Sequence, residues 1–413
     1  MRGETQATPL IIELLFESYR LKGQRSMIFI RNSVKKSIFS FFHIDARKKK
    51  PLLPDSVRSA TFLLMLVFNI NLNAGVENLE TAANSLLTSL SNAQIAEIQY
   101  ELKSNARATW SNLPTFLSPP AGIMMSELSN DQRKQVHKML QSSLSSQGYH
   151  KASSIIRLDD ALHEIEKRTI ESGAGNVAMA KLFVNSRSSL NYSVALFGSP
   201  KDKNWGWKLT GHHLAINVTI NDQRISVTPG FYGSNPRIIA DGAYSGFSPL
   251  AKEHELALSF VEKLSVEQLN KAIISKNKPN DIIEGPGRRG SITNYEGLKS
   301  QELNPSQLAD LQRLILEFVK NGNAQASSNH LDAIASAGWQ NLWFSWRGPV
   351  SRQEPFYYRI HGERLLIEYD LQNSNHDHAI VRDPQNDYGE NWLAHHYKEQ
   401  HPSQKEVMNK LGL

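Results

Sequence analysis

Apolar residues follow two different periods along the chain, and each period predicts a different kind of element. After Gly75 many apolar residues recur every three or four positions, which is the spacing of one buried helix face. This spacing is clearest at Leu311, Leu314, Ile315 and Phe318. Elsewhere the period is two, as expected for strands with one polar face. These stretches are residues 213–220, 356–360 and 365–369.

One local pattern occurs four times and marks the start of a helix. A Leu is followed by Ser or Asn, and a Gln stands three residues after that Ser or Asn. The Ser or Asn side chain can cap the first turn, the Gln can reach back, and the Leu can pack onto the turn. The four copies begin at Leu90, Leu128, Leu264 and Leu303. We expect these four capped helices to be scaffold.

Short polar segments join the predicted strands. Residues 220–223 and 361–363 are typical of hairpin turns, so most neighbouring strands should be antiparallel. Residues 272–296 contain Gly-Pro-Gly and are expected to form a surface loop. The sequence therefore predicts an α+β fold of capped helices packed on a largely antiparallel sheet. We expect one domain over residues 76–405, in which two lobes could meet near 272–296.

The charge of the chain argues against nucleic-acid binding. Residues 1–58 hold twelve Lys or Arg and five Asp or Glu, a net charge of +7, whereas all 413 residues together carry +6. The remainder is therefore close to neutral, at −1, and lacks the concentrated positive surface that phosphate backbones require. The absence of cysteine excludes disulfides, thiol nucleophiles and Cys-ligated metal centres.

Three common catalytic motifs are also absent from the sequence. The chain has no GxSxG nucleophile turn, no phosphate loop ending in GK[ST] and no HExxH pair. The stretch Gly285–Gly290 has the spacing of a dinucleotide-binding loop. Proline occupies its turn and no helix is expected after it, so we interpret it as an ordinary loop.

An apolar run at residues 60–70 lies between Arg58 and the small residue Ala74. It is too short for a stable membrane span and has the length of a secretory signal core. We expect residues 57–74 to be a signal segment, translation to begin near Val57, and residues 1–56 to be a mis-assigned or unstructured extension. The protein would then be periplasmic or secreted. The alternative is an amphipathic extension with a short buried helix.

The strongest candidate chemistry lies near the C-terminus. His376 and His378 are two residues apart, so on an extended segment both imidazoles point to one side and can meet one metal ion. Glu368 on the preceding strand and His213 could add a carboxylate and a third imidazole, and His395 or its neighbour could complete the set. Such ligands suit a divalent ion of zinc, iron, manganese or copper.

A metal held there could polarise a substrate oxygen or activate water, so metal-dependent hydrolysis is the first functional hypothesis. Asp383 and Asp387 would then orient the ligands or act as a base.

Three alternatives remain. The histidines could form a hydrogen-bonded network with Asp383 or Asp387 that needs no ion. A non-enzymatic protein could instead bind a small molecule. Its ligand would contact Trp205, Trp207, Arg359 and Arg382. The protein could also store or buffer a metal ion.

Several separated motifs resemble one protein family. They include the 128–133 segment, Trp205-Gly206-Trp207, Gly211-His212-His213-Leu214, Thr228-Pro229-Gly230-Phe231-Tyr232-Gly233 and the tract 376–397. In this order they resemble the domain of unknown function 3500 family, a largely bacterial group, over residues 83–401. The resemblance implies no catalytic assignment, so each site residue depends on its own chemistry.

Overall fold

The computed structural model describes residues 75–240 and 245–394. Four parts of the sequence analysis lie outside the described residues: the extension 1–56, the candidate signal segment 57–74, His395 and His396. Within the described residues, helices and one large, mostly antiparallel sheet confirm the α+β class.

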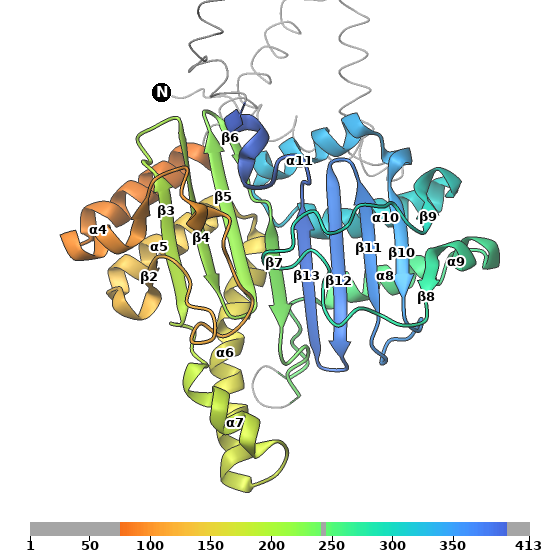
Figure 1. The fold of residues 1–413 in the computed structure, drawn as a ribbon, viewed down its shortest axis with the longest axis horizontal. Coiled ribbons are helices and arrows are strands. Elements are labelled where there is room, and N and C mark those ends of the chain that lie inside the picture. The colour runs from red at the N-terminus through yellow and green to blue at the C-terminus, as the bar shows by residue number, and fades with distance from the viewer. Residues whose placement is uncertain (1–74, 241–244, 395–413) are drawn as a thin grey trace, which may run out of the picture. The chain divides into compact units, whose positions relative to one another are not determined.

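Thirteen strands form the sheet, in the main order β1-β3-β4-β5-β7-β13-β12-β11-β10-β8 (Figure 1). The strands of the first half are β1 (Gln99–Tyr100), β2 (Ile123–Met124), β3 (Tyr192–Gly198), β4 (Asn204–Gly211), β5 (Leu214–Asn221), β6 (Arg224–Ser226) and β7 (Gly230–Ser234). Those of the second half are β8 (Ile273–Ser275), β9 (Leu298–Lys299), β10 (Trp343–Arg347), β11 (Tyr357–Gly362), β12 (Leu365–Asn373) and β13 (His376–Arg382).

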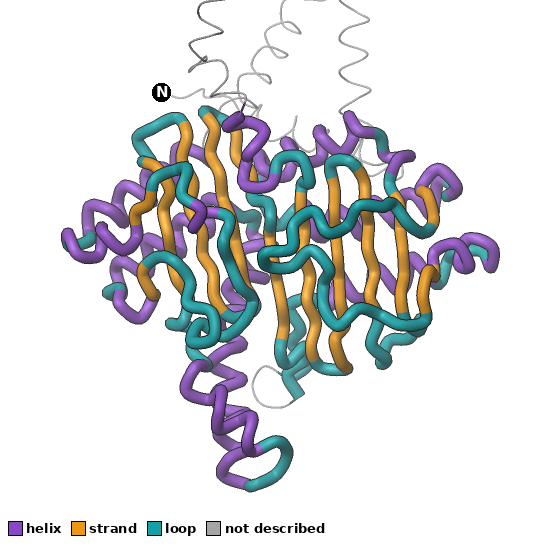
Figure 2. Tube along the Cα trace, viewed as in Figure 1, coloured by secondary structure: helices purple, strands orange, loops and turns teal. Residues whose placement is uncertain are grey.

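The long helices cover one face of this sheet, and long loops cross the other face (Figure 2). The helices are residues 75–89, α4 (Asn92–Ile98), α5 (Asn130–Ser143), α6 (Ser146–Ser172), α7 (Val177–Phe183), α8 (Ala251–Val261), α9 (Val266–Ala272), α10 (Pro305–Val319) and α11 (Ala324–Ala337). The crossing loops are residues 101–122 and 276–297. With both faces covered, all eight residues of β5 are buried, its polar ones included.

The four helix-start patterns form four capping boxes, at the N-termini of α4, α5, α9 and α10. In each half the two capping glutamines also touch each other. Gln94 donates to the Glu127 carbonyl and contacts Gln132, while Gln268 donates to the Glu302 carbonyl and contacts Gln307. The glutamine that caps each helix locally therefore also holds the N-termini of two helices together.

The two halves repeat one arrangement of elements. In the first, β1 pairs parallel and β2 antiparallel with β3. In the second, β8 pairs parallel and β9 antiparallel with β10. A hairpin with a two-residue turn follows in each half, β4–β5 with His212 and His213, and β11–β12 with Glu363 and Arg364. We infer that the chain contains two copies of one structural unit.

Successive antiparallel pairings through β5, β7, β13 and β12 make β5 and β12 run in opposite directions. The copies are therefore related by an approximate two-fold axis perpendicular to the sheet, and both keep their helices on the same face. They join at β7 and β13. The loop 276–297, which includes most of the 272–296 segment where the sequence allowed two lobes to meet, crosses the face of the second half (Figure 1).

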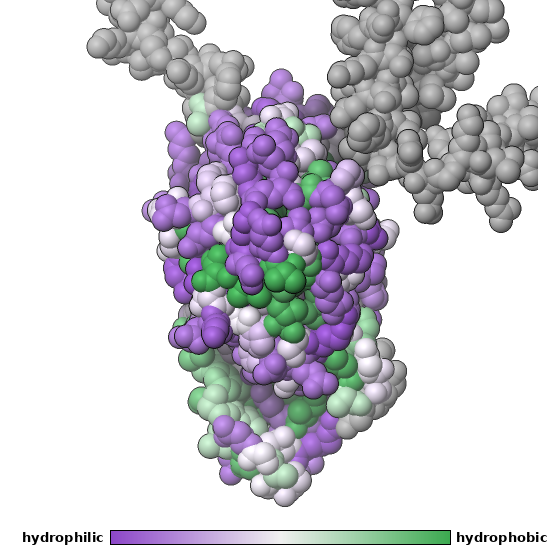
Figure 3. Space-filling model, turned by 90° about the vertical axis from the view of Figure 1, so that its right-hand side faces the viewer, coloured by the Kyte–Doolittle hydropathy of each residue, from purple (hydrophilic) through white to green (hydrophobic). Residues whose placement is uncertain are grey.

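The face of the described surface that Figure 3 shows is mainly hydrophilic. Seen from the edge with β8 and α9, apolar patches lie near the middle and toward the end where α6 and α7 project (Figure 3). Among residues 75–240 and 245–394, no helix is both long enough and apolar enough to cross a membrane.

Equivalent glycines precede the second short strand of each copy. Gly122 and Gly297 have φ angles of +108° and +100°, and a Cβ on either would lie 2.2 Å from a carbonyl oxygen of the neighbouring strand. Only glycine fits a chain that approaches another backbone this closely in that conformation.

We expect Gly297→Ala to lower the free energy of unfolding by at least about 3 kcal/mol, because it adds both a steric clash and an unfavourable φ. Gly287→Ala is the matched control in the same loop, since Gly287 has a φ of +68° and no atom within 4 Å of its Cβ position. It should cost about 1 kcal/mol. Chemical denaturation measures both values, and equal losses would contradict the close approach.

Candidate metal centre

Three histidines from distant parts of the chain lie together at one end of the sheet. His213 occupies the β4–β5 turn, whereas His376 and His378 lie at the start of β13. Strand β7 lies between the two elements. Its Gly233 pairs with His378 and donates its amide to the His213 carbonyl at 2.7 Å. The sheet pairing thus brings together the histidines that the sequence put forward.

The imidazoles meet through their Nε2 atoms. His376 Nε2 is 2.9 Å from His213 Nε2 and 3.0 Å from His378 Nε2. One nitrogen from each of the three rings lies within 4.8 Å of the other two, so the triad could hold a metal ion.

The outer nitrogen of His378 has a carboxylate partner. His378 Nδ1 lies 2.8 Å from Asp281 Oδ1, and Gln372 also hydrogen-bonds this carboxylate. Burial alone would raise the pKa of Asp281, but the hydrogen bonds, led by that from His378, lower it below its usual value. An ionised Asp281 holds the proton of His378 on Nδ1, which leaves the Nε2 lone pair facing the other two rings.

Burial keeps His213 and His376 neutral. It lowers the pKa of His376 to about 3, assisted by neighbouring His378, and it lowers the pKa of His213 well below its usual value. Neutral imidazole is the form that binds metals.

The backbone at His213 is in the left-handed region, with a φ of +62°. That conformation costs a non-glycine residue on the order of 1 kcal/mol, and such strain is concentrated at functional sites. The sequence placed His213 at the start of a strand, whereas the structure begins the strand one residue later, at Leu214.

Gly233 leaves room for two of the rings. A Cβ at this position would lie 2.9 Å from His378 Cδ2 and 3.1 Å from His213 Cγ. Any larger residue would displace a ring, so the glycine sets how closely the two imidazoles approach.

A second polar network surrounds His212, next to the triad. The His212 ring stacks on His213 with centroids 3.7 Å apart, and its Nδ1 lies 2.6 Å from Asp159 Oδ1. Tyr192 donates to Asp159 at 2.9 Å and to the His212 carbonyl at 2.8 Å. Arg187 Nη1 lies 3.1 Å from His212 Nε2. This network holds the turn that carries His213.

Glu368 does not join the histidines. It is fully buried and accepts hydrogen bonds from the amides of Ile283 (2.5 Å) and Glu284 (2.8 Å) and from the Tyr357 hydroxyl (2.7 Å). Burial raises the pKa of Glu368 above its usual value. Its carboxylate fixes the loop that carries Asp281, so it supports the triad indirectly.

Asp383 and Asp387 lie at the opposite end of β13. Asp383 is five positions after His378 along extended chain, a span of roughly 17 Å. Asp383 forms a two-bond ion pair with Arg364 (2.8 and 2.6 Å), and Asp387 accepts from Arg382 at 2.7 Å. Burial raises the pKa of Asp387 to about 6 despite this arginine. The structure thus places both carboxylates and Arg382 in loop-holding contacts.

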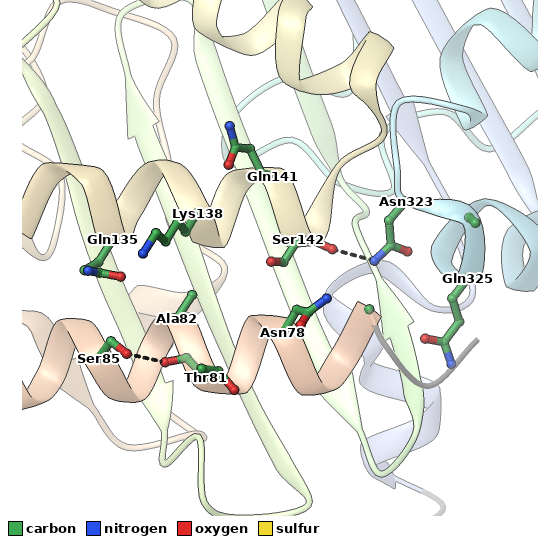
Figure 4. Close-up of a pocket in the computed structure, with 12 residues that line it drawn as sticks. Asn78, Thr81, Ala82, Ser85, Gln135, Lys138, Gln141, Ser142, Asn323 and Gln325 are labelled. Atoms are coloured by element: carbon green, nitrogen blue, oxygen red, sulfur yellow. Dashed lines mark hydrogen bonds between the residues drawn. The ribbon is translucent and has the colours of Figure 1, made fainter. Parts of the chain in front are cut away.

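The residues that the sequence suggested as contacts for a small ligand are buried in the structure. Trp205 and Trp207 are 0% and 1% exposed in the main hydrophobic core, so neither ring presents a face to solvent. Arg359 is 2% exposed and donates to Glu296 at 2.8 Å. A surface groove of about 580 Å³ lies elsewhere, between the 75–89 helix and α5, with mostly amide and hydroxyl side chains (Figure 4).

Sequence reasoning missed Asp281, Gln372 and Asp159. Gln372 lies on the strand paired with β13, where strand register would have indicated it. Asp281 lies in the long loop and Asp159 in α6, and no spacing in the sequence connects either residue to the histidines.

The fold and site define an α+β protein with a three-histidine centre. Residues 73–390 match the family described as "Protein of unknown function (DUF3500)", so the chain belongs to that family. No curated protein and no solved structure gave a significant match to the chain.

We expect Glu368→Gln to lower the free energy of unfolding by about 1–3 kcal/mol, because an amide cannot accept all three hydrogen bonds. The measurements are chemical denaturation and limited proteolysis of residues 276–297, with exposed Glu354→Gln as the control. A variant with unchanged stability that loses bound metal would instead identify Glu368 as a ligand.

Proposed function

We propose that His213, His376 and His378 bind one divalent metal ion and that the protein uses it in hydrolysis. The observation that carries the proposal is the convergence of three Nε2 atoms, at 2.9 and 3.0 Å from the central His376. Only one of these two contacts can be a well-directed hydrogen bond, because His376 Nε2 carries at most one proton and His378 keeps its proton on Nδ1 for Asp281. A cation would satisfy all three lone pairs at once.

The spacing suits a metal of the first transition row. Two imidazole nitrogens bound tetrahedrally to zinc at about 2.05 Å lie about 3.3 Å apart, so binding requires only small ring movements. Zinc, iron and copper accept imidazole readily, whereas manganese prefers oxygen. Asp281 bonded to a ligand histidine is the common arrangement that orients such rings and strengthens them as ligands.

Hydrolysis is the reaction class that we favour. Three protein ligands are typical of catalytic centres, in which water or substrate takes a further position, and the metal would supply Lewis acidity there. Asp281 takes over the orienting role that the sequence assigned to Asp383 and Asp387. Secretion remains a proposal that rests only on residues 57–74.

We expect tag-free protein to contain one equivalent of metal, and His376→Ala/His378→Ala to contain none. Elemental analysis measures both, and His150→Ala, at an exposed histidine, should retain the ion. Asp281→Asn should weaken binding about 10–100-fold in chelator competition. Wild-type protein that cannot be loaded with zinc, iron, manganese or copper would reduce the triad to a polar network.

Hydrolysis is tested with small carboxylic and phosphoric esters as substrates. We expect turnover that a chelator abolishes, that the same ion restores, and that is lost in the double histidine variant while His150→Ala retains it. Turnover that survives complete metal removal would refute the proposed role of the ion.

A further inference from the structure

Five large apolar side chains are exposed in two segments, and residues next to these segments contact the β4–β5 turn. They are Leu113, Phe116 and Leu117 in the 101–122 loop and Met179 and Leu182 in α7, each 47–59% exposed. We call this set the apolar wall. Single exposed apolar residues are ordinary, but a group of this size on one surface commonly marks a binding site.

The loop part of the wall packs on α7 through Phe183, a partly buried residue outside the five. The Phe116 and Phe183 rings are 5.8 Å apart between centroids. Met179 precedes Phe183 by four residues, so both lie on one face of α7, and Leu182 lies beside them. Loop and helix therefore form a single apolar surface.

Two buried residues, Asn112 and Arg187, connect the segments of the wall to the turn that carries His213. The carbonyl of Asn112, the residue before Leu113, accepts the His213 amide at 3.2 Å. On the other side, Arg187 lies 5.1 Å from the Phe183 ring centroid and contacts His212, which stacks on His213. In Figure 1, α6 and α7 project from the end of the sheet that carries the β4–β5 turn.

We propose that the substrate of the histidine centre is a small amphiphile, with a hydrolysable polar group at the metal and an apolar chain along the wall. This inference rests on the proposed function. For an ester, the oxygen of water bonds to the acyl carbon, the ester C–O bond breaks, and the proton passes to the departing alkoxide.

The size of the wall favours a small molecule over a protein. Stable protein interfaces use some 20–30 residues on each side, many more than the wall offers. A chain of several methylenes could instead cover these side chains, and each methylene removed from water strengthens binding up to roughly fourfold.

The test uses hydroxamic acids with acetyl, hexanoyl and decanoyl chains. The head group binds metal, and the change of affinity with chain length measures contact with the apolar wall. Their affinities are measured by calorimetry with zinc-loaded protein. The variant is Phe116→Ser/Leu182→Ser, and the control is Val266→Ser, an apolar position on α9 that is 78% exposed. All three sites are exposed, so the fold should persist.

We expect wild-type and control affinity to rise at least about tenfold from acetyl to hexanoyl. In the variant the rise should fall below about threefold, with acetyl binding unchanged. Two outcomes would overturn this inference and leave the proposed metal site intact. In one, the acetyl compound binds in a zinc-dependent way but affinity does not rise with chain length. In the other, affinity rises equally in the wild type and the variant. Binding that does not depend on zinc at any chain length would overturn the proposed function and the inference with it.

Discussion

The pairing of β7 with β13 is the contact on which the rest of the structure depends. Five residue pairs from Asp377 opposite Ser234 to Val381 opposite Gly230 join the two copies into one sheet. The same pairs place His378 beside Gly233, whose amide holds the carbonyl of His213. One strand register therefore determines both the continuity of the fold and the meeting of residues 165 positions apart, and a shift by one residue would turn His378 toward the helices.

Local signals explain what the sequence could predict. The helix starts were predictable because a cap depends on residues within four positions of each other, and tertiary contacts then reinforced it. His376 and His378 could be paired because strand side chains alternate. Glu368 was a reasonable ligand by residue type. Its partners are backbone amides of a loop some 85 residues away, which no periodicity can reveal.

Burial of both faces of the sheet explains why other residues differ from what the sequence predicted. Where loops cover the polar face of a sheet, polar and aromatic strand residues lose their exposure and acquire structural partners. Arg359 and Glu296 pair in this way, as do Lys278 and Asp370 at 2.7 Å. Trp205 and Trp207 were candidate ligand contacts in one alternative because the strand pattern does not show which face is covered. The long loops that decide this have almost no regular structure to predict.

The two copies of the repeated unit differ in the contacts that hold their equivalent hairpin turns. At the β11–β12 turn, Arg364 closes a two-bond ion pair with Asp383, a contact that fastens one end of the sheet. The equivalent β4–β5 turn is held differently, because His212 contacts Asp159 of α6 and Arg187, whereas His213 faces the other histidines of the triad. A duplicated fold can thus hold one turn by an ion pair with the neighbouring strand end and the other by partners from a helix. The strained backbone of His213 is then tolerable, because the shared sheet and the His212 network keep the turn in place.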